Sequence, residues 1–169
     1  MTAGDWKRRL EEWLTEGTIA TIIPEVAALR GVPQPPEFHP EGDALTHTLQ
    51  AVAEVDDLDD ERVFWAVLLH DIGKKSTTRF FNGRWRAHGH ADVGAEMARD
   101  ILNRNGLEHL AGDVYWIIKN HHYKQSWNLK ADQLLSRNQR RFLEHPLFTL
   151  LEKVCAADSA GRKINGTSP

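Results

Sequence analysis

Histidine and aspartate side chains stand in this sequence at positions where a helix would bury them. Residues on one face of a helix recur every three or four positions, and five apolar stripes with this spacing contain or end in such groups. The residues concerned are His47, His70, Asp71, His90, His121, His122 and Asp158. An ionised aspartate in an apolar interior is costly unless a partner neutralises it. A divalent metal ion would neutralise the carboxylates and would take the imidazoles as ligands.

The chemistry of these groups favours a transition metal. Neutral imidazole nitrogen together with carboxylate oxygen suits Mn, Fe, Co, Ni or Zn, whereas Mg and Ca sites mostly use oxygen ligands. One inward-facing histidine is more often a hydrogen-bonded core residue than a ligand, but the same coincidence on five segments indicates a shared site. We therefore expect one or two divalent transition-metal ions.

Helices must position these side chains, because the spacing of apolar residues is helical along most of the chain. The segments with this spacing are 5–16, 24–30, 43–55, 60–71, 91–104, 107–122 and 146–160. Residues 31–36 contain three prolines, which remove backbone donors and restrict the preceding residues, so a loop is predicted there. Residues 123–145 are mixed and polar, with Trp127, Leu134 and Leu135 as the expected anchors.

A small β-hairpin is expected near residues 78–87. The segments 78–81 and 84–87 flank Asn82-Gly83, and an Asn-Gly pair supplies the positive φ angles of a tight type I′ turn. The fold class that we predict is therefore all-α, with this hairpin as an insertion.

Length and composition restrict the class of protein. A chain of 169 residues with 41% hydrophobic and 27% charged residues fits one folded domain, and we expect a single domain over residues 1–169. The net charge of −3 gives no global reason to bind nucleic acid. The single cysteine excludes an internal disulfide, and no apolar run approaches the roughly 20 residues that span a bilayer. We expect a cytoplasmic protein that does not bind a membrane and needs no obligatory protein partner.

The order of the polar residues resembles a known signature. His47, the pair His70-Asp71 and Asp158 resemble the H…HD…D pattern of the HD-domain superfamily, whose members are helical, metal-dependent phosphohydrolases. The resemblance implies an HD-domain helical bundle with its core at about residues 38–163. Residues 1–37 would then supply N-terminal helices and the proline-rich loop.

Longer strings look most like the HD domain attached to bacterial tRNA nucleotidyltransferases. These strings are Phe38-His39-Pro40-Glu41-Gly42-Asp43, Thr46-His47-Thr48-Leu49, Leu69-His70-Asp71-Ile72-Gly73-Lys74 and Gly89-His90. In that family the HD domain is associated with phosphatase, 2′-nucleotidase and 2′,3′-cyclic phosphodiesterase activity. Only about 37 residues precede this region, too few for a nucleotidyltransferase domain, so we expect a free-standing version. Tyr123-Lys124-Gln125 departs from the Gly-Tyr-Pro element of cyclic-di-GMP phosphodiesterases.

The resemblance also implies roles for the individual residues. His47, His70, Asp71 and Asp158 would hold one metal ion, and such an ion lowers the pKa of a coordinated water to about 7, so that hydroxide can attack phosphorus. Asp71 would bridge to a second ion, because the additional histidines resemble those of HD members with two metals. Those histidines are His90, His121 and His122, the last as an outer ligand or a substrate contact. The expected catalytic residues are Asp71, Lys74 and His122.

Cationic side chains near this centre are candidates for substrate binding. Lys74 follows the His-Asp pair across a turn opened by Gly73, and a lysine there can pair with a phosphate oxygen. The other candidates are His88, Arg79, Arg86 and Arg162. Alternating arginine and aromatic residues are more often the two faces of an amphipathic hairpin, and His88 can face either the site or solvent.

The function that the resemblance implies is hydrolysis of a phosphate ester carried by a nucleotide or an RNA end. The enzyme would be a phosphomonoesterase, a 2′,3′-cyclic phosphodiesterase, or both. One alternative is a mononuclear 5′-nucleotidase that uses His47, His70, Asp71 and Asp158 alone. Another is a non-catalytic module that holds a structural metal or senses a nucleotide. Surplus ligands argue against a structural site, which is usually four-coordinate.

Overall fold

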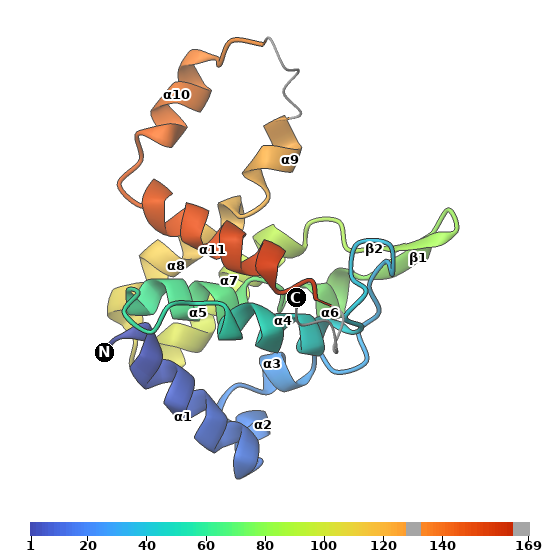
Figure 1. Cartoon of the computed structure of the whole chain (residues 1–169), viewed down its shortest axis with the longest axis vertical. Coiled ribbons are helices and arrows are strands. Elements are labelled where there is room, and N and C mark those ends of the chain that lie inside the picture. The colour runs from blue at the N-terminus through green and yellow to red at the C-terminus, as the bar shows by residue number, and fades with distance from the viewer. Residues whose placement is uncertain (128–132, 164–169) are drawn as a thin grey trace.

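Helix α5 (Glu61–Leu69) lies at the centre of the molecule, with other helices packed around it (Figure 1). The computed structural model describes residues 1–127 and 133–163. The other helices of that part are α1 (Ala3–Thr15), α2 (Ile19–Ile22), α3 (Pro24–Ala27), α4 (Ala44–Ala53), α6 (Lys74–Thr77), α7 (His90–Arg104), α8 (Glu108–Asn120), α9 (Tyr123–Trp127), α10 (Arg137–Leu143) and α11 (Phe148–Ala160). Its strands are β1 (Arg79–Phe81) and β2 (Arg84–Arg86). The predicted helical bundle with a small hairpin is confirmed.

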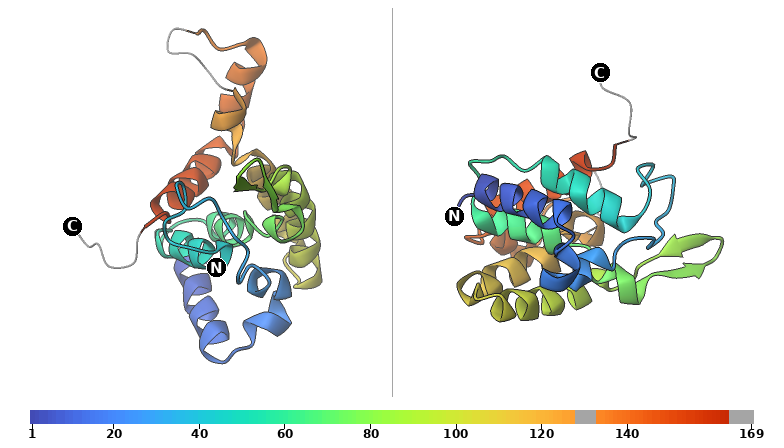
Figure 2. Two further views of the ribbon diagram at one scale, coloured as in Figure 1. Left: turned by 90° about the vertical axis from the view of Figure 1, so that its right-hand side faces the viewer. Right: turned by 90° about the horizontal axis from the view of Figure 1, so that it is seen from below.

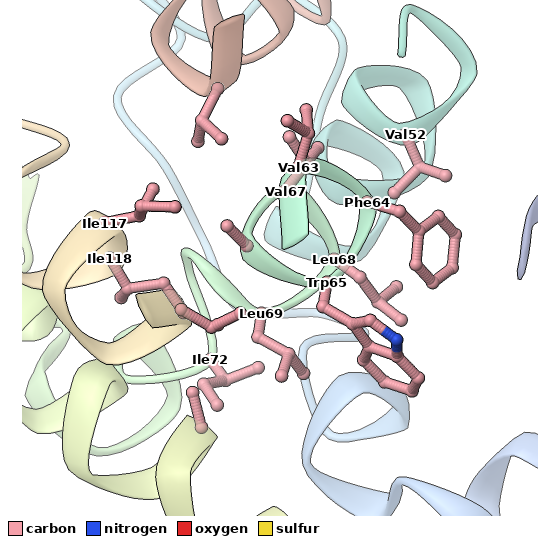
Figure 3. Close-up of a cluster of buried hydrophobic side chains, with 14 of the residues drawn as sticks. Val52, Val63, Phe64, Trp65, Val67, Leu68, Leu69, Ile72, Ile117 and Ile118 are labelled. Carbon is pink, nitrogen blue, oxygen red and sulfur yellow. The ribbon is translucent and has the colours of Figure 1, made fainter. Parts of the chain in front are cut away.

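Helix α5 is buried on every side. All of its residues from Val63 to Leu69 are buried, and a helix that is apolar all round belongs in a core. Helices α1, α4, α8 and α11 pack against it. Figure 3 shows its side chains surrounded by others, including Val52 of α4 and Ile117 of α8. Asp60 caps the start of this helix, because its side chain accepts a hydrogen bond from the backbone N–H of Arg62 at 2.8 Å.

The N-terminal segment covers this core from one side. Trp6 of α1 packs against Phe64 and Trp65 of α5, with ring centroids 6.3 Å and 4.9 Å apart. Residues 31–36 contain no helix, as their prolines predict. The chain then enters α4 at Asp43, whose side chain accepts a hydrogen bond from the backbone N–H of Thr46 at 2.8 Å.

The predicted hairpin forms with the predicted turn. Strands β1 and β2 pair antiparallel with Phe80 opposite Trp85. Asn82 and Gly83 both have positive φ angles, 49° and 76°, as a type I′ turn requires. The hairpin projects away from the helices in two views (Figures 1 and 2).

Some sequence predictions of helix ends and buried faces are wrong. The segments 60–71 and 107–122 end as helices at Leu69 and Asn120, so that a pair of polar residues follows each. Val93 of α7 and Leu14 of α1 have the helical spacing of a buried face, but each is 38% exposed. None of the helices in the described ranges combines the length and the apolar character that crossing a membrane requires.

The segment predicted to be irregular, 123–145, contains helices α9 and α10. Phe142 of α10 stacks on Trp116 of α8 with ring centroids 5.3 Å apart, and it also contacts Tyr123 and Trp127 of α9. Trp127 is therefore an anchor, as predicted. Leu134 is not, because it is 90% exposed. An aromatic cluster that joins distant positions has no local periodicity, which is why the sequence did not indicate it.

Candidate metal centre

The side chains predicted to share a site come together in the structure, and five helices deliver them. His47 lies within α4, and Asp158 lies in the last turn of α11. The pair His70-Asp71 directly follows α5, and the pair His121-His122 directly follows α8. His90 is the first residue of α7. The ends of α5 and α8 therefore bring their polar pairs to the same place, while the apolar residues of both helices stay in the core.

The first group of contacts joins the carboxylates of Asp71 and Asp158 to two imidazoles. His47 Nε2 lies 3.0 Å from Asp158 Oδ1 and 3.8 Å from Asp71 Oδ2. His70 Nε2 lies 3.2 Å from Asp71 Oδ2 and 3.9 Å from Asp158 Oδ1. All four residues are buried. Two imidazoles and two carboxylates thus direct one atom each toward a common point.

A second group lies on the other side of Asp71. The second carboxylate oxygen of Asp71, Oδ1, lies 3.4 Å from His90 Nε2. His90 Nε2 lies 3.0 Å from His122 Nε2, and the imidazole of His121 is close enough to both for the three residues to share one ion. Asp71 therefore presents one oxygen to each group of histidines.

Backbone carbonyls fix the orientation of three of these imidazoles. The Nδ1 atoms of His70, His90 and His121 donate hydrogen bonds of 2.6–2.7 Å to the carbonyl oxygens of Val67, Ala87 and Ile118, respectively. In each case the acceptor lies three residues earlier in the chain. A carbonyl oxygen can only accept, so Nδ1 must carry the proton, and Nε2 of the neutral ring keeps its lone pair for a cation.

His47 is oriented differently, by a carboxylate. It lies inside α4, and its Nδ1 lies 2.7 Å from Glu41 Oε1. The same oxygen lies 2.9 Å from Nδ1 of His39. The side chain of Glu41 has no exposed surface. Carboxylates in this position orient a ligating imidazole and make it more basic, so Glu41 belongs to the supporting structure of the site.

Buried atoms without partners provide a test of whether a metal fits. Within the described part of the chain, His70 Nε2, His121 Nε2 and Asp71 Oδ1 are buried without a hydrogen-bond partner. Such atoms are costly in a protein interior unless something satisfies them. Two nitrogen ligands about 2.1 Å from one ion and at right angles to each other lie about 3 Å apart, which matches the spacing of His90 and His122. The donor set therefore fits a divalent metal ion.

Burial and local charge set the protonation of the site. Burial, reinforced by His90, lowers the pKa of His122 to about 4. Burial also holds the pKa of His121 well below its usual value, with the neighbouring imidazole of His122 adding to the effect. For Asp158, burial favours the neutral acid, but the hydrogen bond from His47 outweighs it and lowers the pKa. At neutral pH His121 and His122 are thus neutral and Asp158 is charged, the forms that bind metal.

Two glycines allow the ligand-bearing segments to approach closely. A Cβ atom on Gly73 would lie 2.2 Å from the carbonyl oxygen of His90 and 2.8 Å from the nitrogen of Gly94. A Cβ atom on Gly161 would lie 2.7 Å from the backbone nitrogen of Ala51. The first contact brings Asp71 to His90, and the second brings the end of α11 and Asp158 to α4 and His47.

A pocket opens beside the centre. It has a volume of about 490 Å³, open solvent included, and Lys74, His90, His122 and Arg86 line it together with Pro33, Gln34, Pro35, His39, Thr78, Trp85 and Ala87. Lys74 Nζ lies 2.7 Å from Asp71 Oδ2 and donates a hydrogen bond to Gln34 Oε1 at 2.6 Å. The lysine therefore places a buried positive charge beside Asp71, at the wall of the pocket.

Of the other four predicted substrate contacts, Arg86 lines this pocket. Arg162 instead donates to both oxygens of Asp158, at 3.2 Å and 3.3 Å, and so holds that carboxylate. Arg79 is exposed on the hairpin, and His88 is exposed. Neither of these two residues is among those that line the pocket.

Sequence reasoning missed Glu41 and Gln34 as members of the site. Both are polar residues that the structure buries, and both lie in or next to the proline-rich loop, where no periodicity indicates burial. The available signal was the string His39-Pro40-Glu41, which stands immediately before the helix that carries His47.

Comparison with known proteins gives one family and a set of similar chains. The family model described as HD domain matches residues 44–160. A protein of Halorhodospira halophila named Multifunctional CCA protein is 40% identical over 92% of this chain. Proteins of the same name from Psychromonas ingrahamii and Alkalilimnicola ehrlichii are 32% and 34% identical over 86% of it. The chain spans only 36–38% of the length of these three relatives.

Proposed function

This chain belongs to the HD domain family, a superfamily of metal-dependent phosphohydrolases, and we propose that it hydrolyses phosphate esters of nucleotides or RNA ends. The proposed activities are those of a phosphomonoesterase and a 2′,3′-cyclic phosphodiesterase. The observation that carries the proposal is Asp71, whose two oxygens are buried and face separate groups of imidazoles, with Lys74 beside Oδ2. Hydrolysis of phosphate esters uses such pairs of metal sites, because two ions can stabilise the attacking and the leaving oxygen together.

In this proposal two groups of residues hold the ions. His47, His70, Asp71 and Asp158 would hold one, and His90, His121 and His122 together with Asp71 would hold the other. When bound, the metal supplies Lewis acidity and an activated water at neutral pH. We propose Mn, Fe, Co, Ni or Zn, since the ligands mix nitrogen and oxygen.

The chain's own residues then bind and orient the substrate. Lys74 lies at the boundary between the ligands and the pocket, so its charge can pair with a phosphate oxygen. Arg86 approaches the pocket from the hairpin and offers a guanidinium to the same anion. Trp85, Pro33 and Pro35 supply apolar walls against which a nucleoside can pack.

The names of the relatives favour an RNA-related substrate. They are called Multifunctional CCA proteins, and the motifs of this chain resemble those of the HD domain of tRNA nucleotidyltransferases. The chain matches little more than a third of each relative, so we transfer only the phosphohydrolase activity of the HD domain to it. A mononuclear 5′-nucleotidase is less well supported, because it gives no role to the buried, unpartnered Nε2 of His121.

A metal and substrate panel tests the proposal. We expect the purified protein to bind one or two transition-metal ions per chain and to hydrolyse 2′-, 3′- or 2′,3′-cyclic nucleotides with Mn, Co or Ni. Asp71→Ala should abolish turnover and metal binding, because it removes both bridging oxygens. Asp100→Ala, a change of the same charge at an exposed position of α7, is the control and should behave as the wild type. Full activity of Asp71→Ala, or inactivity of the wild type with every divalent ion, would refute the proposal.

A further inference from the structure

One face of the β-hairpin is cationic. Side chains alternate between the two faces of a strand, and the register places Arg79 opposite Arg86 and Phe81 opposite Arg84. These four side chains therefore share one face, which we call the arginine face. The other face carries Phe80 and Trp85, whose rings meet edge-on with centroids 5.2 Å apart.

Packing does not explain the arginine face. Like charges directly opposite one another destabilise a pair of strands, and Arg79 and Arg86 are such a pair. Among the described residues, no aspartate or glutamate forms an ion pair with Arg79, Arg84 or Arg86. A pair of strands this short has little stability of its own, so the repulsion is not offset within the hairpin.

Phe81 is exposed at the turn end of this face. Its side chain is 60% exposed, and its neighbours on the face are Arg79 along the strand and Arg84 across the strands. The hairpin as a whole stands out from the helices in two views (Figures 1 and 2). An aromatic ring among cations on an accessible projection is the arrangement with which proteins bind single-stranded nucleic acid.

The arginine face is continuous with the catalytic pocket. Arg86 belongs to the face and also lines the pocket beside Lys74 and His122. Its Nε atom is buried and has no hydrogen-bond partner in the described part of the chain. Arg84 lies two residues farther along the strand, about 7 Å away. The positive charge therefore forms a path that leads from the outer end of the hairpin to the proposed metal ligands.

We infer that the arginine face binds the backbone of a single-stranded RNA whose terminal phosphate lies in the pocket. The inference rests on the proposed function and narrows its substrate class from free nucleotides to the ends of RNA chains. Arg79 and Arg84 bind phosphates of nucleotides upstream of the end, and Phe81 stacks on a base. Arg86 binds the phosphate nearest the pocket.

Binding without catalysis tests the arginine face separately from the metal centre. The probe is an oligoadenylate of about ten nucleotides with a 3′-terminal phosphate and a fluorophore at its 5′ end, titrated in EDTA and followed by anisotropy. Each phosphate contact contributes about 0.7 to the slope of log affinity against log salt. Arg79→Ala/Arg84→Ala should therefore lower that slope by about 1.4, and Phe81→Ala should weaken binding about fivefold or more. The control Arg9→Ala/Arg137→Ala removes the same charge from exposed positions of α1 and α10 and should bind as the wild type does.

Hydrolysis then tests the substrate class. The quantity to measure is the ratio of kcat/KM for an oligoadenylate ending in a 2′,3′-cyclic phosphate to kcat/KM for 2′,3′-cyclic AMP. We expect the wild type to prefer the oligonucleotide and the Arg79/Arg84 double variant to lose most of that preference. Two results would overturn the inference while leaving the phosphohydrolase activity intact. One is the same ratio of kcat/KM values in the wild type and the double variant, and the other is displacement of the probe by polyglutamate as readily as by unlabelled oligoadenylate. Oligonucleotide binding through the arginine face by a protein that hydrolyses nothing would refute the proposed function alone.

Discussion

At the scale of single residues, the site depends on how each imidazole is oriented. His70, His90 and His121 use the carbonyl three residues earlier, a contact available because each lies at a helix end. His47 lies within α4 and approaches Glu41 instead. The neighbouring histidine, His39, shares the same carboxylate oxygen. Of these four imidazoles, His47 thus depends on a side chain from a loop, and the other three depend on backbone carbonyls close to them in the chain.

This difference predicts the effect of changing Glu41. Glu41→Gln keeps an oxygen near His47 but removes the negative charge, and Glu41→Ala removes both. Changes of this kind in residues that orient a metal ligand typically weaken metal binding about 10- to 100-fold, so we expect a graded loss with the alanine variant at the upper end. Titration against a competing chelator measures the metal affinity of each variant. Glu37→Gln, in the same loop but exposed, is the control. If Glu37→Gln and Glu41→Gln bound metal with the same affinity, Glu41 would not be the residue that orients His47.

At the scale of elements, the centre depends on close contact between the turn after α5 and the start of α7. Gly73 makes that contact possible, since a Cβ atom there would overlap the carbonyl oxygen of His90. The φ angle of Gly73 is −64°, which any residue can adopt. Space, rather than backbone conformation, therefore requires glycine at this position.

Gly73→Ala should accordingly separate α7 from the turn. We expect a loss of about 1–3 kcal/mol in the free energy of unfolding, typical of overpacking, together with weaker binding of the metal held by His90. Gly112→Ala is the comparison, because nothing lies within 4 Å of the added atom. In the middle of α8 that change should stabilise the protein by up to about 1 kcal/mol. Urea denaturation measures both, and a Gly73→Ala variant as stable as wild type would show that the contact is less tight than described.

At the scale of the whole molecule, burial of the site links stability to pH and to metal. The pKa values of His90, His121 and His122 are lowered by burial, whereas an unfolded histidine has a pKa near 6.5. Below that pH the unfolded chain takes up protons that the folded chain does not, so folding is disfavoured. His70 acts in the opposite direction, because Asp71 outweighs its burial and raises its pKa. Burial also lowers the pKa of His39. Four imidazoles with lowered pKa values therefore outweigh one with a raised pKa, and the net effect of acid is to destabilise the fold.

The metal-free protein should therefore lose stability as the pH falls from 7 to about 4.5. His122, with a folded pKa of about 4, contributes at most about 3 kcal/mol to this loss. The carboxylates take little part, since the lowered pKa values of Asp71 and Asp158 move their contribution below pH 4. Denaturation at several pH values, with EDTA present, measures the slope, and His122→Asn should make it shallower. Stability that stays constant or rises on acidification would be inconsistent with neutral, buried imidazoles.

The sequence by itself determined the helical fold, the hairpin turn and the set of polar residues on buried faces. These are local properties, because periodicity of three and four residues, an Asn-Gly pair and the identity of a side chain act within a few positions. It also indicated membership of the HD domain family through the order of His47, His70-Asp71 and Asp158.

Only the tertiary structure decided how these residues combine. That Asp71 faces two groups of imidazoles depends on contacts between helices far apart in the chain. That Glu41 orients His47 depends on how the loop before α4 folds. The helices α9 and α10 likewise depend on an aromatic cluster drawn from separate segments. Such contacts arise from the packing of whole elements, and the spacing of residues along one element does not contain that information.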